Sequence, residues 1–407
     1  MKKGWEVKKL GDVCQLITDG THNSPQYVVS GIPMLDSRNI NDYFQIDDSK
    51  PDKYISIDTD RMLSRRCKPK ENDILISSRG TIGKIAIVRN GQNFNIMGNM
   101  ILLRLNEGIT PKFIALALYA NVNYIESIAK GSSQKGLYLN QIRNIYISLP
   151  PLPEQQRIVA ILDEVLSAID KAKENAGKNL NNARELFDSY LQSVFANNGD
   201  GWEERKLGDN HLIEIIDGDR GKNYPSKNEF SQEGFCLFMN TKNVRPDGFD
   251  FKSTVFISEE KDKALSKGKL KRNDVVMTTR GTIGNLGVYN NDVEYKNIRI
   301  NSGMLIFRPD ISAILPEYLF EVLRSGIIKN QIKKNMTGAA QPQLPIKTLV
   351  NFTFPLPKSI LEQRSIVFKL DTLLEETKKL EVIYEQKLVD LDELKQSILE
   401  KAFKGEL

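Results

Sequence analysis

The sequence predicts an α+β protein made of two similar mixed α/β lobes and two long helices. Three observations support this prediction. Segments near the start of the chain recur about two hundred residues later, which indicates a duplicated domain because one unit of a solenoid is far shorter. Each copy contains short apolar runs around glycine turns, a pattern typical of strands. Each copy ends in a proline-rich stretch followed by about 40 residues with helical periodicity and no proline.

The duplication is clearest in two motifs. Residues 4–12 return as residues 201–209, each with tryptophan in second position and Lys-Leu-Gly-Asp at the end. The pentapeptide Arg-Gly-Thr-Ile-Gly occurs at 79–83 and again at 280–284. We therefore expect four segments: a first lobe at 1–153, a first helix with its linker at 154–201, a second lobe at 202–357 and a second helix at 358–407.

Within each lobe the pattern is mixed. Residues 73–77 and 84–88 read as strands on either side of the first glycine turn, and residues 274–288 repeat this arrangement. Pro111 and Pro316 each start a helical stretch, where a missing amide proton costs nothing.

The two long segments show the alternating three- and four-residue steps of a coiled-coil seam. A second consecutive step of four occurs once in each helix, between Ala176 and Leu180 and between Tyr384 and Leu388. The first helix carries the chain from lobe to lobe and the second leaves by the equivalent exit, so we expect an antiparallel pair with a pseudo-twofold axis. The C-terminus should then return to the neighbourhood of Trp5. The predicted seam residues are Ile158, Leu162, Val165, Ile169, Leu180, Phe187, Ile366, Leu370, Leu373, Leu380, Tyr384 and Leu388.

Both helices are entered through proline. Residues 149–153 and 354–357 should be extended and stiff, because proline fixes φ and removes a hydrogen-bond donor. The acidic and amide side chains that follow suit the free amides of a first helical turn. A partner motif of the PxxP type is the alternative to this structural hinge.

Charge is unevenly distributed along the chain. The net charge of +5 divides into +6 on residues 1–153, −2 on residues 154–196, +3 on residues 197–357 and −2 on residues 358–407, so the positive charge lies on the lobes and not on the helices. This bias fits lobes that bind a polyanion, and it equally fits an ordinary solvated surface.

The chain has no apolar run long enough to span a membrane and no signal-peptide core at its start. Three scattered cysteines, Cys14, Cys67 and Cys236, argue against a disulfide framework or a zinc site and suit the cytoplasm.

Signals for catalysis are almost absent. His22 and His211 stand in no metal-ligand spacing, and the nucleotide-binding, hydrolase and adenine-methyltransferase motifs are missing. The sequence therefore predicts a binding protein and not an enzyme, with no metal site. The alternative is a metal-dependent nuclease that uses Asp73 and Asp274 with Mg²⁺, although these aspartates more plausibly start strands.

Taken together, these motifs resemble a specificity subunit of a type I DNA restriction-modification system over the whole length of the chain. The resemblance rests on Trp5 with residues 9–12 and the copy at Trp202, on residues 79–84 and their copy, on residues 131–137 with 338–344, on the proline entries with residues 154–157, and on residues 402–407. It implies two target-recognition domains that read a bipartite, asymmetric site in double-stranded DNA.

The resemblance also implies partners. Two methyltransferase subunits would dock on the helices and lobes, and two restriction and translocase subunits would join the full complex. S-adenosylmethionine, Mg²⁺ and ATP are expected on those partner subunits and none on this chain.

Candidate DNA contacts lie in two loops of each lobe. The glycine turn allows two interpretations. The glycines let the backbone approach a phosphate that the arginine at the tip binds, or the segment is simply a tight turn with an exposed arginine. In the loop at 131–136, glutamine can pair with adenine, or it can brace the following strand. Two basic clusters, at 65–70 and 267–272, are solvated faces or DNA clamps. The candidates are Arg79, Thr81, Lys84, Ser132, Ser133, Gln134, Lys135, Arg280, Thr282, Asn285 and Gln341.

Overall fold

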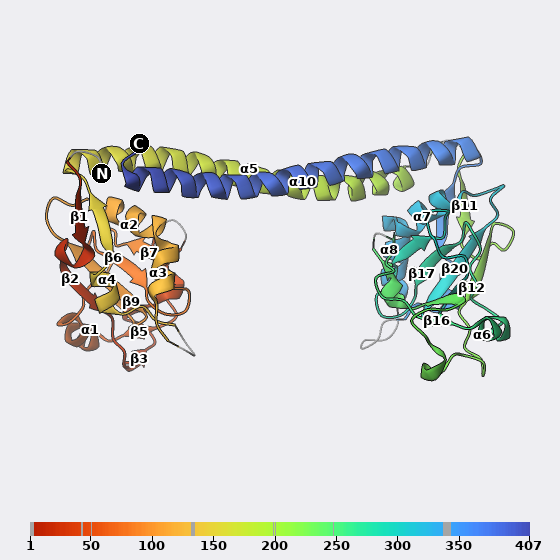
Figure 1. The fold of residues 1–407 in the computed structure, drawn as a ribbon, viewed down its shortest axis with the longest axis horizontal. Coiled ribbons are helices and arrows are strands. Elements are labelled where there is room, and N and C mark those ends of the chain that lie inside the picture. Colours follow the sequence, from red (N-terminus) through yellow and green to blue (C-terminus); the bar gives the residue numbers. More distant parts are fainter. Residues whose placement is uncertain are drawn as a thin grey trace. The chain divides into compact units, whose positions relative to one another are not determined.

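The computed structural model describes residues 4–41, 44–49, 51–131, 135–197, 199, 201–246, 248–336 and 343–407. The chain forms two compact units. Unit 1 comprises Met1–Ala176 and Gln386–Leu407, and unit 2 comprises Gly177–Glu385. Each unit thus holds one lobe and a part of each long helix, α5 (Leu152–Ala196) and α10 (Ile360–Lys404) (Figure 1).

Lobe 1, the part of unit 1 outside the long helices, is built around a four-stranded antiparallel sheet of order β2-β9-β6-β7. A smaller sheet of order β3-β5-β4-β8 and a two-stranded pair of β1 and β10 complete it. Its elements are β1 (Glu6–Lys9), β2 (Cys14–Asp19), β3 (Tyr27–Val28), β4 (Ile32–Leu35), η2 (Ser37–Asn39), β5 (Tyr54–Ile55), α1 (Ile57–Ser64), β6 (Ile74–Ser77), β7 (Ile85–Ile87), β8 (Asn95–Ile96), β9 (Met100–Leu105), α2 (Pro111–Ala120), α3 (Val122–Ile128), α4 (Leu139–Arg143) and β10 (Tyr146–Leu149), with the short η1 (Leu10–Asp12) after β1.

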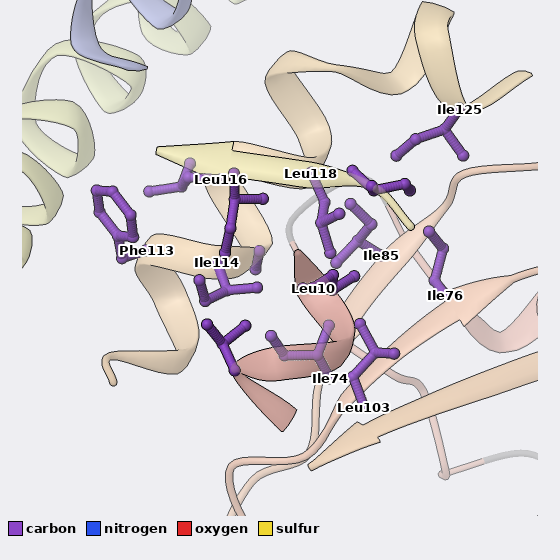
Figure 2. Packing of buried hydrophobic residues seen from close by; sticks show 14 of the residues in the cluster. Leu10, Ile74, Ile76, Ile85, Leu103, Phe113, Ile114, Leu116, Leu118 and Ile125 are labelled. Carbon is purple, nitrogen blue, oxygen red and sulfur yellow. The ribbon is translucent and has the colours of Figure 1, made fainter. Parts of the chain in front are cut away.

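The main sheet of lobe 1 is covered on both faces, which explains its nearly continuous apolar strands. Ile74 and Ile76 of β6 point into the cluster that packs against α2, while Leu75 between them joins the core on the other face. Figure 2 shows the first cluster, where Leu118 of α2 lies beside Ile85 of β7, and Phe113 lies farther from the sheet on the side of the long helices. The sheet therefore has a fixed register, since a one-residue slip would exchange the two faces.

Lobe 2, the corresponding part of unit 2, repeats this plan. Its main sheet has the order β12-β20-β17-β18 and is again buried on both faces, with Val275 in one core and Val276 in the other. Its elements are β11 (Glu203–Lys206), β12 (Ile213–Asp217), η3 (Lys227–Glu229), β13 (Cys236–Met239), η4 (Thr241–Asn243), β14 (Val244–Arg245), β15 (Gly248–Phe249), β16 (Phe256–Ile257), α6 (Glu259–Ala264), β17 (Val275–Thr278), β18 (Leu286–Val288), β19 (Ile298–Ile300), β20 (Met304–Pro309), α7 (Pro316–Arg324), α8 (Gly326–Asn335), α9 (Ile346–Leu349) and β21 (Thr353–Leu356).

Within each unit the two long helices run antiparallel. In unit 1, Lys173 Nζ lies 2.6 Å from Asp392 Oδ1 and Lys395 Nζ lies 3.3 Å from Asp170 Oδ1, so residue numbers rise on one helix as they fall on the other. In unit 2, Arg184 Nη2 contacts Glu385 Oε1 at 2.6 Å. The predicted fold class of two mixed lobes and two antiparallel long helices is confirmed.

The helix seams contribute to the lobe cores as well as to each other. Ile158, Leu162 and Leu166 of α5 belong to the core of lobe 1. Most of the predicted seam residues are buried or half-buried. Leu380 departs from this expectation, since it is 37% exposed. Beyond Leu374, α10 no longer belongs to the core cluster of lobe 2. Its side chains there can pack against α5 but not against the lobe.

The proline entries place a buried glutamine at the start of each long helix. Gln155 Oε1 accepts a hydrogen bond from the amide of Thr110 at 2.9 Å, and its Nε2 donates to the carbonyl oxygen of Pro150 at 2.9 Å. Gln363 does the same in unit 2 with the amide of Leu315 and the carbonyl oxygen of Pro357. These amides therefore join the helices to α2 and α7, in addition to standing in the first turn as the sequence suggested.

The C-terminal segment returns to the N-terminal tryptophan, as predicted. Trp5, Leu399 and Ala402 belong to one buried cluster. The ring of Phe403 packs edge-on against that of Phe113, with centroids 5.3 Å apart. The end of α10 is therefore part of the core of lobe 1.

Candidate nucleic-acid interface

The first glycine turn is the tip of the β6–β7 hairpin. Gly80 has a φ of 76°, a left-handed backbone that glycine adopts without strain. Ser77 Oγ donates to the carbonyl oxygen of Thr81 at 2.6 Å and accepts from the amide of Lys84 at 2.8 Å. The turn is fixed from inside by these bonds, and Arg79 and Thr81 face solvent.

A second segment lies against this turn. The amide of Ser78 donates to the carbonyl oxygen of Asn99 at 2.8 Å. Asn99 Nδ2 in turn donates to Ser37 Oγ at 3.1 Å. Because Ser37 precedes the exposed Arg38, these contacts bring Arg38 to the same end of the sheet as the glycine turn. Asp36 holds Arg38 through a bidentate pair with distances of 2.8 to 3.2 Å.

His22 comes to this end through the loop after β2. The amide of Gly98 donates to the carbonyl oxygen of Thr21 at 2.7 Å. A Cβ atom at position 98 would lie 2.6 Å from His22 Nδ1, so glycine lets the imidazole rest against the backbone. The exposed imidazole therefore lies next to the segment that holds the glycine turn.

The loop at 130–136 also joins the turn. The amide of Leu137 donates to the carbonyl oxygen of Ser78 at 2.9 Å, and Arg79 forms a bridge with Gly136. Lys135 is exposed there. The candidates Ser132, Ser133 and Gln134 lie outside the described residues. We call the surface formed by residues 20–23, 37–39, 79–81, 97–99, 130–131 and 135 the loop edge of lobe 1.

Lobe 2 builds the same surface from equivalent contacts. The amide of Thr279 donates to the carbonyl oxygen of Gly303 at 2.8 Å, and Arg280 forms a bridge with Gln343. Arg220 Nη2 lies 3.3 Å from the carbonyl oxygen of Ser302. We call residues 218–221, 241–243, 280–282, 301–303 and 343 the loop edge of lobe 2. Arg280 and Thr282 are exposed on it, and Gln341 lies outside the described residues.

Two of the candidate DNA contacts, Lys84 and Asn285, make hydrogen bonds inside the loop edges. Lys84 is half-buried and its Nζ lies 3.4 Å from the carbonyl oxygen of Ile40. Asn285 is 9% exposed and its Nδ2 donates to the carbonyl oxygen of Val244 at 2.9 Å. Ile40 and Val244 follow the equivalent turns η2 and η4, so both side chains tie the glycine turn to its neighbour. A DNA contact from either residue stays a prediction.

Part of each basic cluster is engaged in intramolecular contacts. Lys68 Nζ binds Asp60 Oδ1 at 2.8 Å, and Arg66 pairs with Asp19. In lobe 2 the guanidinium of Arg272 stacks on the ring of Tyr289, 4.1 Å from its centroid. These contacts favour the interpretation of the clusters as structural faces.

The aspartates of the nuclease alternative are buried in ion pairs. Asp73 accepts hydrogen bonds from Nε and Nη2 of Arg104 at 2.8 and 2.6 Å, and Asp274 accepts the same pair from Arg308 at 2.9 Å each. Within the described part of the chain, no three His, Cys, Asp or Glu side chains gather as metal ligands.

Burial raises the pKa of the thiols of Cys14, Cys67 and Cys236 to about 12, which makes them poor nucleophiles.

The fold and these surfaces define a duplicated recognition protein, in which two lobes of one plan present different side chains at equivalent edges. A model of the type I restriction modification DNA specificity domain matches residues 2–177 and 199–385. The chain belongs to this family. In the ranges that the structure describes, no helix combines the length and apolar character needed to cross a bilayer.

Several relatives carry the same description. The EcoBI specificity subunit of a type I restriction enzyme of Escherichia coli is 25% identical over 73% of this chain and 65% of its own length. The MjaVIII specificity subunit of Methanocaldococcus jannaschii is 25% identical over 91% of this chain and 86% of its own. The chain thus spans just under two thirds of the first of these relatives and most of the second.

Solved structures show the same fold. A chain from a study of complex assembly and conformational transition of the type I R-M system has a TM-score of 0.74 at 22% identity, covering 100% of this chain and 99% of that one. The HsdS subunit from Thermoanaerobacter tengcongensis has a TM-score of 0.66 at 22% identity, covering 100% of this chain and 98% of that one.

Several basic residues of the loop edges were not predicted as DNA contacts from the sequence, among them His22, Arg38 and Arg220. His22 was considered only as a metal ligand, and Arg38 and Arg220 were not considered. A signal for two of them exists in the sequence: Asp19-Gly20 precedes His22 by the same spacing as Asp217-Gly218 precedes Arg220.

Proposed function

We propose that the chain is the DNA-recognition subunit of a type I restriction-modification complex, with each lobe contacting one half of a bipartite, asymmetric target. The single observation that carries this proposal is the pair of equivalent loop edges, built by the same hydrogen bonds but bearing different side chains. Basic side chains at an edge supply phosphate attraction, and side chains that differ between lobes supply different base contacts.

The chemistry would belong to partner subunits. Two methyltransferase subunits with S-adenosylmethionine, and two restriction and translocase subunits with ATP and Mg²⁺, would complete the assembly. The buried ion pairs of Asp73 and Asp274 support a non-catalytic role for this chain, because a carboxylate held by a bidentate guanidinium is not presented to a metal or a water.

We expect the chain and its partner methyltransferase to methylate adenines in one bipartite motif, and the chain alone to methylate none. Sequencing of methylated adenines in a host that carries both genes measures this. Exchanging residues 202–357 for the equivalent lobe of a relative should change one half of the motif and leave the other. A simultaneous change of both halves would contradict the modular proposal.

The scaffold role has a candidate surface on α10 in unit 2. Leu361, Phe368 and Val382 are 75%, 71% and 67% exposed. They stand seven and fourteen residues apart, so they lie close to one line along the helix. Exposed apolar residues at heptad spacing are typical of a helix that packs against a further helix of a partner. We propose that a methyltransferase subunit covers this line.

Phe368→Asp should therefore weaken the complex with the methyltransferase subunit by about 2 kcal/mol or more, roughly thirty-fold in Kd, as for a buried aromatic anchor. Lys369→Asp is the matched control, since Lys369 is the exposed neighbour on the same turn. Titration of labelled methyltransferase measures both affinities. Equal affinities for the two variants would rule out this surface.

A further inference from the structure

The loop after the first strand of each main sheet follows one plan in both lobes. Asp19 pairs with Ile101 in β9, and Asp217 pairs with Leu305 in β20; both partners are the second residue of their strand. Each aspartate is followed by a glycine, and the residue three positions after the aspartate is His22 in lobe 1 and Arg220 in lobe 2. These two residues are therefore structural equivalents.

The glycines of this loop are required by close backbone contact. A Cβ atom at Gly20 would lie 2.2 Å from the carbonyl oxygen of Ile96, and one at Gly218 would lie 2.2 Å from the carbonyl oxygen of Asn301. No side chain fits at such distances, so the loop passes directly against the segment before β9 in lobe 1 and against the segment before β20 in lobe 2. This close contact places the fourth residue at the loop edge in each lobe.

The aspartates fix the orientation of the fourth residue. His22 Nε2 lies 2.6 Å from Asp19 Oδ2, and Arg220 Nη2 lies 3.1 Å from Asp217 Oδ2. The imidazole and the guanidinium still expose 45% and 51% of their side-chain surface. Each side chain is thus oriented by its aspartate and leaves about half of its surface in solvent.

In lobe 2 the side chain of Asp219 also fixes the loop. Asp219 accepts hydrogen bonds from the amide of Gly221, from the amide and hydroxyl of Ser266 and from the amide of Lys267. The hydrogen bond from Gly221 is the largest of the effects that lower the pKa of Asp219 to about 2, so the carboxylate stays charged and bound at neutral pH. Arg220 therefore stands on a preorganised loop.

The neighbouring carboxylate decides what kind of contact Arg220 makes. The ion pair of Arg220 and Asp217 has little net charge, and its carboxylate repels a phosphate that approaches it. A fixed orientation matters more for a base edge, where two parallel hydrogen bonds must be made at once. Within the described residues, the hydrogen bonds of Arg220 all come from Nη2, so Nε and Nη1 keep their hydrogens for a further partner.

We propose that positions 22 and 220 are equivalent base-reading positions of the two lobes, and that Arg220 selects a guanine in the half-site of lobe 2. The inference rests on the proposed function. His22 offers a single imidazole edge at the same place, so the two half-sites differ at the base that this position reads. The shared aspartate and glycine form the frame, and the variable fourth residue sets the specificity.

The test uses the full chain with its methyltransferase partner and compares methylation rates on a panel of duplexes that vary one base pair at a time. Arg220→Ala should reduce the preference for guanine at one position of one half-site by about 10- to 100-fold and leave the other half-site unchanged. Arg220→Lys should lose the same preference, because lysine keeps the charge but lacks the fork. His22→Arg should add a guanine preference in the other half-site.

The control is Arg205→Ala, which removes an arginine of similar exposure on β11, away from the loop edge; the motif should not change. A uniform loss on all duplexes with a shallower salt dependence would make Arg220 a phosphate contact and overturn the proposal. An unchanged motif would overturn it as well. If Arg220→Ala unfolds in a thermal melt, the lysine variant decides. Failure of the unsubstituted complex to methylate any specific motif would instead refute the proposed function.

Discussion

Replacing Gln155 by leucine should destabilise unit 1 by about 2–4 kcal/mol, because the part-buried amide of Thr110 and the buried carbonyl oxygen of Pro150 would lose their partner. Gln155 is 2% exposed and bonds both groups at 2.9 Å. Each unpaired buried polar group costs about 1–3 kcal/mol. Leucine restores the bulk of the side chain but neither hydrogen bond.

The neighbouring Gln156 supplies a matched control, since it is the same residue type in the same helical turn but faces solvent. Gln156→Leu should change stability by less than about 0.5 kcal/mol. The chain has two tryptophans, Trp5 in unit 1 and Trp202 in unit 2. A Trp202→Phe background therefore lets fluorescence in a urea titration report unit 1 separately. Equal stabilities of the two leucine variants would show that the glutamine does not join helix and lobe.

Arg308→Met should destabilise unit 2 by about 3–5 kcal/mol, the usual cost of leaving a buried charge unpaired. The carboxylate of Asp274 has no exposed surface and receives both of its guanidinium hydrogen bonds from Arg308. Hydrogen bonding to Asp274 raises the pKa of Arg308, while burial raises the pKa of Asp274, so the pair loses its charge at the carboxylate when the pH falls. Methionine fills a similar volume without neutralising the carboxylate.

Adding Asp274→Asn to Arg308→Met should recover part of the loss, because the buried group is then neutral. Arg205→Met is the control: its pairs with Glu203 and Asp209 are exposed and should contribute no more than about 1 kcal/mol. Urea unfolding is followed through Trp202 in a Trp5→Phe background. A loss below about 1 kcal/mol for Arg308→Met would contradict the assigned role of the pair.

Sequence patterns predicted the elements whose signal is local. The strands around residues 74–77 and 275–278 and the helices that start at Pro111 and Pro316 follow from apolar runs and from proline at a first helical position. The antiparallel pairing of the long helices followed from chain direction alone. The seam was predicted less well at Leu380, because the pattern does not say where the lobe stops covering the helix.

The candidate site was harder to predict because it is made of short loops from distant parts of the chain. Arg79 and Arg280 were found because they stand beside conspicuous glycines. His22 and Arg220 were not, since their place beside the glycine turn depends on hydrogen bonds to residues 97–99 and 301–303. Asn285 is a candidate DNA contact in the sequence, and in the structure its side chain donates a hydrogen bond to the carbonyl oxygen of Val244.

The sequence by itself determined the duplication, the two lobes and two long helices, the family, and the direction in which the helices pair, because repeats and heptad steps are properties of the chain alone. Only the tertiary structure decided which polar residues are structural and which face solvent. Gln155, Asp73 and His22 are all polar residues whose surroundings the sequence does not show. Their roles differ because part of those surroundings comes from distant segments: Thr110 for Gln155, Arg104 for Asp73 and Gly98 for His22.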